Sequence, residues 1–301
     1  MKTIRKIMAA THTNDDAIAG IVVAVMIVGL ILAIVSIVQT VYIPKWMQSR
    51  EAEHMGVVGD QLSELKYAID AQSTIRQTLP ISTSITLGSK ELGFLTSSKA
   101  FGRLTIEENA TALYCKLYNG TEFQNQFGIL KYSSENSYFL DQTYIYEIGA
   151  LILDQTQGSV LTIKPSLKAS YNYSAPPTVL LNITCVNLIP VGGKTSISGY
   201  GTYPIRTEYL YSTNKISNQV TILKMTTQYP TIWYRFLNDT FSGVGLKEGN
   251  IASASNVQYN ITQVGNQITV TFNDPGQYLA NVKLNYRIIT ILVQIAPGWV
   301  E

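Results

Sequence analysis

Two cysteines are the only thiols in this chain of 301 residues, and both lie in segments with the alternating pattern of a β-strand. In ALYCKLY, Cys115 lies on the face of the strand opposite to Lys116. In LLNITCV, Cys185 shares a face with Leu181 and Ile183. Because side chains alternate between the two faces of a strand, both sulfurs are predicted to point inward. Outside the cytosol they could form a disulfide that closes a loop of about 70 residues and stabilises by about 4 kcal/mol. Two separate buried thiols are the alternative.

The other side chains that could do chemistry do not form a catalytic motif. His12 and His54 are the only histidines, and neither has metal-binding spacing. His54 follows Glu51 and Glu53 in a helical segment and is predicted to be solvated. We find neither a nucleophile elbow nor a phosphate-binding loop, and a net charge of +2 gives no basic patch for nucleic acid. We therefore predict that the protein is not an enzyme and uses no cofactor or metal. A two-carboxylate hydrolase would have to draw on scattered acids: Asp141, Glu147, Asp154, Glu208, Asp239 and Asp274.

Asn-x-Ser/Thr sequences, the acceptors of N-linked glycans in secreted domains, recur along the chain. The strand pattern predicts that Asn182 and Asn260 face outward, and Asn119 precedes a glycine in an expected turn. The acceptors are Asn109, Asn119, Asn172, Asn182, Asn238 and Asn260. Glycosylation of at least some of them is expected if this part of the chain is extracellular.

One uncharged segment, residues 17–43, divides the chain. Its core reads IVVAVMIVGLILAIVSIVQTVYI, and about 26 residues make a helix of roughly 39 Å, longer than the ~30 Å hydrocarbon core of a bilayer. A cleaved secretory signal would have a shorter apolar region. We therefore predict a retained helix that spans a membrane or lines a filament core. The basic residues in segment 1–16 favour a cytoplasmic leader and an extracellular remainder.

Two kinds of helix packing are predicted in the first 80 residues. Gly20/Ala24 and Gly29/Ala33 have the small-xxx-small spacing that lets membrane helices approach closely. Pro44 is expected to kink the chain at the membrane surface, and an amphipathic helical stalk then occupies residues 44–79. An apolar stripe on this stalk packs either on the chain's own head or on neighbouring copies. The stripe consists of Met55, Val58, Leu62, Leu65 and Ile69.

After Pro80 the pattern changes to two-residue alternation, with short stretches rich in Val, Ile, Thr and Tyr between turn residues. It predicts a mainly β protein with N-terminal α structure, in which residues 80–301 form an antiparallel β-sandwich head. The head is either one large sandwich or two subdomains divided near residues 190–201. Pro230 begins a stretch with helical spacing, so we expect one short helix on the sheet. Further expectations are a hairpin over 259–272, a turn over 272–278 and a buried central strand over 288–295.

The order of these segments resembles the archaeal type IV pilins and archaellin-like proteins. The similarity lies in AIAGIVVAVMIVGLILAIV, in the stalk that follows it and in the β pattern beyond. It implies a leader cut by a prepilin-type peptidase around residues 16–20, and an apolar helix that leaves the bilayer to line a filament. The expected partners are copies of the chain or related pilin-like subunits. The implied role is that of a structural or adhesive subunit at the cell surface.

A second function remains open beside this one. Asp15 and Asp16 stand where such leaders carry a basic and a small residue. The alternative is a single-pass anchored ectodomain that binds carbohydrate or protein and does not polymerise.

Overall fold

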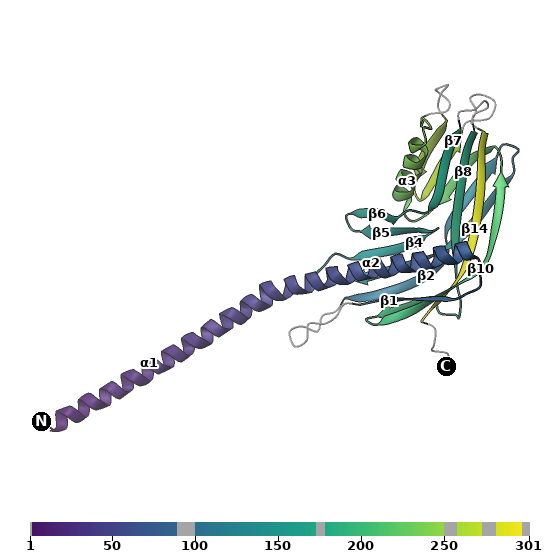
Figure 1. Cartoon of the computed structure of the whole chain (residues 1–301). Helices are drawn as coiled ribbons and strands as arrows, with labels where there is room; N and C mark the ends of the chain where they lie inside the picture. Colours follow the sequence, from purple (N-terminus) through teal and green to yellow (C-terminus); the bar gives the residue numbers. More distant parts are fainter. Residues whose placement is uncertain (1, 89–99, 173–177, 250–257, 273–280, 297–301) are drawn as a thin grey trace.

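The computed structural model describes residues 2–88, 100–172, 178–249, 258–272 and 281–296, with side chains from residue 19 onward. It confirms a mainly β protein with one long N-terminal helix (Figure 1). The helical segments are α1 (Lys2–Ile37), the π-helix η1 (Val38–Tyr42), α2 (Ile43–Ile75) and α3 (Pro230–Gly243). The strands are β1 (Ile81–Thr86), β2 (Phe101–Leu117), β3 (Glu122–Glu135), β4 (Gln142–Glu147), β5 (Ala150–Gln155), β6 (Gly158–Ile163), β7 (Ser166–Asn172), β8 (Thr178–Pro190), β9 (Ser196–Gly199), β10 (Thr202–Ser217), β11 (Val220–Thr226), β12 (Tyr259–Val264), β13 (Gln267–Phe272) and β14 (Asn281–Ile295).

The first two helices and the π-helix between them form one continuous rod that bends but does not break (Figure 1). Pro44 lies in the first turn of α2, directly after η1. Proline has no N–H to donate, and the wider turn of the π-helix accommodates the lost hydrogen bond. The rod ends at Ile75, earlier than the predicted residue 79. It ends there because Arg76 adopts a left-handed conformation, with φ of 56°, and donates its N–H to the Gln72 carbonyl.

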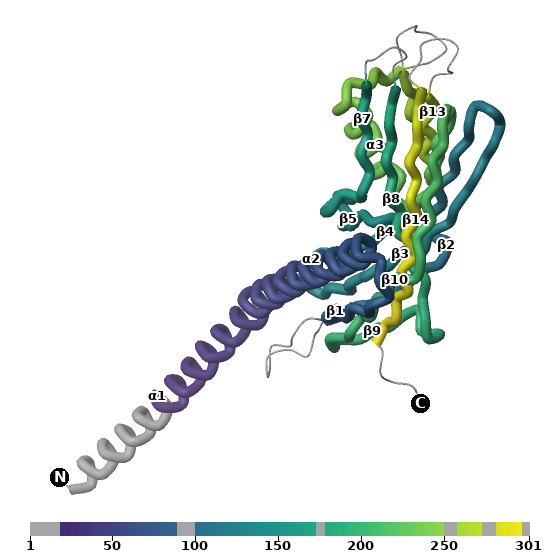
Figure 2. The backbone as a smooth tube through the Cα atoms, turned by 45° about the vertical axis from the view of Figure 1, so that its right-hand side comes forward, coloured from purple at the N-terminus to yellow at the C-terminus, as the bar shows by residue number. Residues whose placement is uncertain are grey.

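Two sheets face each other in the head (Figure 2). The five-stranded sheet has the order β1-β10-β14-β8-β7, and the nine-stranded sheet has the order β12-β13-β11-β2-β3-β4-β5-β6 with β9 on β2. All the pairs are antiparallel except β8 with β14. A parallel pair needs a long crossover, and the chain between these strands supplies one that includes α3. The predicted central strand over 288–295 is the second half of β14, which lies between β10 and β8.

The segment 190–201 joins the two sheets. β8 before it and β10 after it both belong to the five-stranded sheet, and β9 within it pairs with β2 of the other sheet. The buried core has two clusters, one beneath α2 and one beneath α3, and β2, β3, β8 and β14 contribute to both. The boundary between the two clusters therefore runs across these long strands. It does not coincide with a division of the chain near residues 190–201.

α2 fills the end of the sandwich between β1 and β4, which belong to different sheets (Figure 1). Its apolar stripe is buried there: Met55, Val58, Leu62, Leu65 and Ile69 are at most 2 % exposed. Two glutamines add polar contacts, because Gln61 bonds Thr86 of β1 and Gln72 donates to the Thr207 carbonyl of β10. Of the two predicted arrangements, the stripe packs on the chain's own head. The interpretation that it packs on neighbouring copies is wrong, because the head already covers it.

The short helix and the hairpin are found where the sequence predicts them. α3 begins at Pro230 and buries one face, with Trp233, Phe236 and Phe241 in the core. Phe241 packs edge-on against Tyr259 of β12, with ring centroids 5.4 Å apart. Residues 259–272 form the β12–β13 hairpin. The turn predicted over 272–278 lies almost wholly outside the described residues.

Two glycines in α2 give opposite predictions for the same substitution. Gly56 has open space where a Cβ would lie, so Gly56→Ala is expected to raise the free energy of unfolding by about 0.5–1 kcal/mol through helix propensity. At Gly59 a Cβ would come within 2.7 Å of the Tyr144 hydroxyl oxygen, so Gly59→Ala is expected to destabilise by about 1–3 kcal/mol. Chemical denaturation of the full chain in detergent, followed by tryptophan fluorescence, measures both. Equal effects of the two substitutions would contradict the packing of α2 on β4.

Candidate functional site

The apolar part of the helical rod has no covering from the rest of the described chain. Side chains from Ile21 to Val41 are exposed almost throughout, and this helix is long and apolar enough to cross a membrane. A Cβ added at Gly20 or Gly29 would meet nothing within 4 Å, and Ala24 and Ala33 are exposed. The small-xxx-small positions are therefore open to an external partner.

The helix passes from the exposed apolar part to the part covered by the head within about one turn, near residues 42–47. Tyr42 and Trp46 are about half exposed, and their ring centroids lie 6.0 Å apart on one side of the helix. Ile43 and Met47, on the adjacent face of the helix, are buried against the head. Tyrosine and tryptophan favour the interface between lipid and water, where one part of the ring system is dry and another is wet. The pair marks the place where an apolar environment would end.

Glu51 fixes the helix to the head immediately after this point. Its carboxylate is fully buried and accepts hydrogen bonds from three successive backbone N–H groups of the β3–β4 turn. The donor–acceptor distances are 3.0 Å from Ser137, 2.7 Å from Tyr138 and 2.6 Å from Phe139. Successive N–H groups that converge in this way form an anion-binding nest. The nest holds the turn against α2 and satisfies the buried charge.

His54 is the second polar contact between the helix and the head. Its Nε2 lies 3.1 Å from the Tyr132 hydroxyl oxygen, and the Tyr132 hydroxyl donates to the Leu87 carbonyl at 2.8 Å. Burial lowers the pKa of His54, while the Leu87 backbone and the negative charge of Glu51 oppose that effect. The neutral imidazole therefore fits this position better than the charged form.

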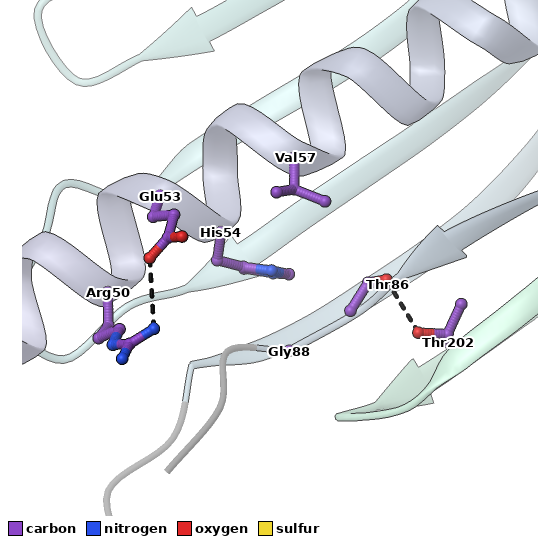
Figure 3. Close-up of a pocket in the computed structure, with 7 residues that line it drawn as sticks. All are labelled: Arg50, Glu53, His54, Val57, Thr86, Gly88 and Thr202. Atoms are coloured by element: carbon purple, nitrogen blue, oxygen red, sulfur yellow. Dashed lines mark hydrogen bonds and ion pairs between the residues drawn. The ribbon is translucent and has the colours of Figure 1, made fainter. Parts of the chain in front are cut away.

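A surface pocket of about 350 Å³ opens beside His54, between α2 and β1 (Figure 3). In Figure 3, His54 points from the helix towards the strands, and the Arg50–Glu53 ion pair lies at one end, with 3.4 Å between nitrogen and oxygen. Thr86 and Thr202 share a hydrogen bond of 2.9 Å at the other end. The pocket thus combines one imidazole, two hydroxyls and an exposed ion pair. The described residues of the pocket suit polar contacts, and none of them forms a nucleophile–base pair.

The prediction that His54 is a solvated side chain is wrong, and Glu51 likewise lies inside the contact. The apolar stripe of α2 continues towards the N-terminus at the same spacing through Met47, Glu51 and His54. The sequence interpretation began the stripe at Met55 and left the polar Glu51 and His54 out of it. The spacing alone would have placed both of them on the buried face.

The two cysteines both point inward and are free, which agrees with the predicted alternative of two separate buried thiols. Both belong to the core cluster beneath α3. Burial raises the pKa of Cys115 to about 12 and raises that of Cys185 further. Neither is a thiolate at neutral pH, so neither is an activated nucleophile.

The six glycan acceptors divide into two groups. Asn109, Asn119 and Asn172 are exposed, and Asn109 lies at a bulge of β2 with φ of 55°. The others are half-buried: Asn182 accepts a hydrogen bond from Asn285 on the neighbouring strand, Asn238 accepts one from the Tyr259 hydroxyl, and Asn260 lies on β12. Asn182 and Asn238 are therefore half-buried and hydrogen-bonded, whereas the first three residues are exposed, with Asn119 accepting a hydrogen bond from the Thr121 N–H.

Four of the six scattered acids have structural partners. Glu147 is buried and accepts from Thr111, from Thr227 at 2.7 Å and from the Trp233 indole N–H at 2.5 Å. Burial raises its pKa, and the three donors oppose that effect. Asp141 accepts from the Asn136 N–H, Asp154 from Ser159, and Glu208 pairs with Arg206; Asp239 lies exposed on α3, and Asp274 is outside the described residues. Within the described ranges, no three His, Cys, Asp or Glu side chains are placed to hold a metal ion.

His54 predicts how the stability of the head depends on pH. Its pKa is lower in the folded protein than in the unfolded chain, so the unfolded chain binds more protons near the usual value of 6.5. The contribution of His54 is therefore fully present above pH 6.5 and is lost as the pH falls below it. The charged groups nearby are Glu51, Arg50 and Glu53. Denaturation midpoints between pH 5 and 8, for the wild type and for His54→Gln, measure the effect. A slope of the same size in both proteins would contradict it.

No family model, no curated protein and no solved structure matches this chain.

Proposed function

We propose that this protein is a pilin-like structural or adhesive subunit of a cell surface, anchored or assembled through its N-terminal apolar helix. One observation carries the proposal: a single rod is uncovered in its apolar half and built into the head in its polar half. A helix of this kind needs an external apolar environment, which a bilayer or the helices of other copies can provide. The role is not enzymatic.

The mode of assembly follows from the open face of the helix. Gly20, Ala24, Gly29 and Ala33 have nothing from the described part of their own head against them. A prepilin-type peptidase that cuts around residues 16–20 would leave these positions near the mature N-terminus. They would then pack against the same helix in neighbouring subunits of a filament, with the heads on the outside. The leader would stay in the cytoplasm, and Asn109, Asn119 and Asn172 could carry glycans.

A second function is favoured by the aromatic pair at the end of the apolar run. Tyr42 and Trp46 are half exposed where a membrane-spanning segment would meet water. In a permanently anchored protein they would stay at that interface, and the head would bind a carbohydrate or protein from a single-pass anchor.

Mapping the mature N-terminus by mass spectrometry of protein taken from its native membrane tests the first function. A start between residues 16 and 20 supports it, and an intact Met1 contradicts it. Electron microscopy of the same material should show filaments. A matched pair of variants then tests the helix face: Gly29→Leu is expected to abolish filaments, whereas Ile31→Leu, at an exposed apolar position, is expected to keep them. Monomers extracted by detergent, with no filaments in either case, would favour the permanently anchored module.

A further inference from the structure

The last strand of the nine-stranded sheet has a free edge beside α3. β6 pairs with β5 on one side only, and no backbone hydrogen bond joins its other edge to another described residue. Figure 1 shows β6 directly below α3, and the two elements are in contact. A free edge presents a row of N–H and C=O groups that an added strand can pair with.

A groove of about 360 Å³ runs between this edge and the helix. Leu161 of β6 and Ile232 and Phe236 of α3 give it an apolar wall, and these side chains continue into the core beneath α3. Val160, the neighbour of Leu161 on the edge, is 61 % exposed. An exposed valine next to an apolar wall and a free strand edge leaves apolar surface for an incoming side chain to cover.

Charged groups stand along the same groove. Lys164 follows β6, Arg235 and Asp239 lie on α3, and all three are exposed. No ion pair between described residues neutralises either cation. These two cations, which form no ion pair with a described residue, complement a carboxylate, and the planar guanidinium of arginine can bind both carboxylate oxygens.

We propose that the groove between β6 and α3 binds an extended peptide segment of a partner protein, which adds to β6 as a further strand. An apolar side chain of the peptide packs on Leu161, Ile232 and Phe236, and an acidic side chain meets Arg235 and Lys164. This is strand addition, in which backbone pairing supplies affinity and pockets for alternate side chains supply specificity. The pairing of β6 with β5 is regular only up to the register shift between Leu151 and Ile152. Because the regular part of β6 is short, the free edge that a peptide can use is also short, and the affinity is expected to be modest. The inference holds whether or not the chain polymerises.

A labelled peptide tests the proposal against the full chain in detergent. The probe is a seven-residue peptide of alternating threonine and valine with a central glutamate, followed by fluorescence anisotropy. Two control peptides have lysine in place of the glutamate, or proline in place of the valines, which removes backbone donors. Hydrogen exchange of residues 158–163, with and without the probe, reports whether the edge becomes paired.

The expected result is saturable binding of the glutamate peptide, slower exchange in β6 and no binding of the proline peptide. The double variant Lys164→Glu and Arg235→Glu should weaken binding about tenfold or more, whereas Lys283→Glu, an exposed cation on β14, should leave it unchanged. The absence of binding, equal binding of the proline peptide, unchanged exchange in β6, or equal affinity of the double variant would each overturn the proposal.

Discussion

Replacing Gly128 with alanine is expected to lower the free energy of unfolding by about 3 kcal/mol or more. Gly128 lies on β3, and a Cβ at this position would come within 2.1 Å of the Leu188 carbonyl oxygen of β8. The Gly128 N–H also donates to the Asn187 side chain at 2.9 Å. Here the backbones of the two sheets touch directly, so no change of side-chain rotamer can relieve the clash.

Gly243→Ala is the matched control for this experiment. Gly243 is the last residue of α3, and a Cβ there would meet nothing within 4 Å. Its replacement is expected to change stability by less than about 1 kcal/mol. Urea denaturation of both variants in detergent, read by the fluorescence of the buried Trp233, gives the comparison. A Gly128→Ala protein as stable as the wild type would show that the two sheets do not approach at this point.

Replacing Glu51 with alanine is the second change with a large expected effect: it should lower the free energy of unfolding by about 3 kcal/mol. The substitution removes the acceptor of three N–H groups in the β3–β4 turn and leaves those donors unsatisfied beside a buried helix. Glu51→Gln retains one acceptor oxygen and is expected to lose less. The first consequence should be release of the turn, which faster hydrogen exchange at residues 137–139 would report.

Glu53 provides the control two residues along the same helix. Its side chain is exposed and forms only a surface ion pair with Arg50, so Glu53→Ala is expected to change stability by at most about 0.5 kcal/mol. If Glu51→Ala and Glu53→Ala had equal effects, the nest would have no energetic role in holding the head to the helix.

The elements that the sequence predicts well are those whose signal is local. The apolar helix follows from an uninterrupted run of uncharged residues, and α3 follows from Pro230 at the first turn of a segment with helical apolar spacing. The β12–β13 hairpin follows from alternation on both sides of a glycine turn. In each case the residues that determine the element lie within it.

The features that were missed depend on residues far apart in the chain. The parallel pairing of β8 with β14 joins segments separated by about ninety residues, and strand alternation carries no information about direction. Glu51 and His54 are buried because Ser137–Phe139 and Tyr132 supply polar partners more than 75 positions away. Polarity predicted solvent for His54, and the spacing of the stripe left open whether it packs on the head or on neighbouring copies. Both polar groups are buried because distant residues supply their hydrogen-bond partners.

The continuous rod couples the tilt of the apolar helix to the position of the head. The helical segment from Ala19 to Ile75, 57 residues long, continues through η1 without interruption, and the head is fixed to its last 33 residues, which make up α2. At 1.5 Å per residue, α2 extends roughly 50 Å. A tilt of about 20°, usual for helices that cross a bilayer, would therefore carry its far end about 17 Å sideways. If the apolar segment lies in a bilayer or a filament core, small rotations of this segment would therefore become large displacements of the head.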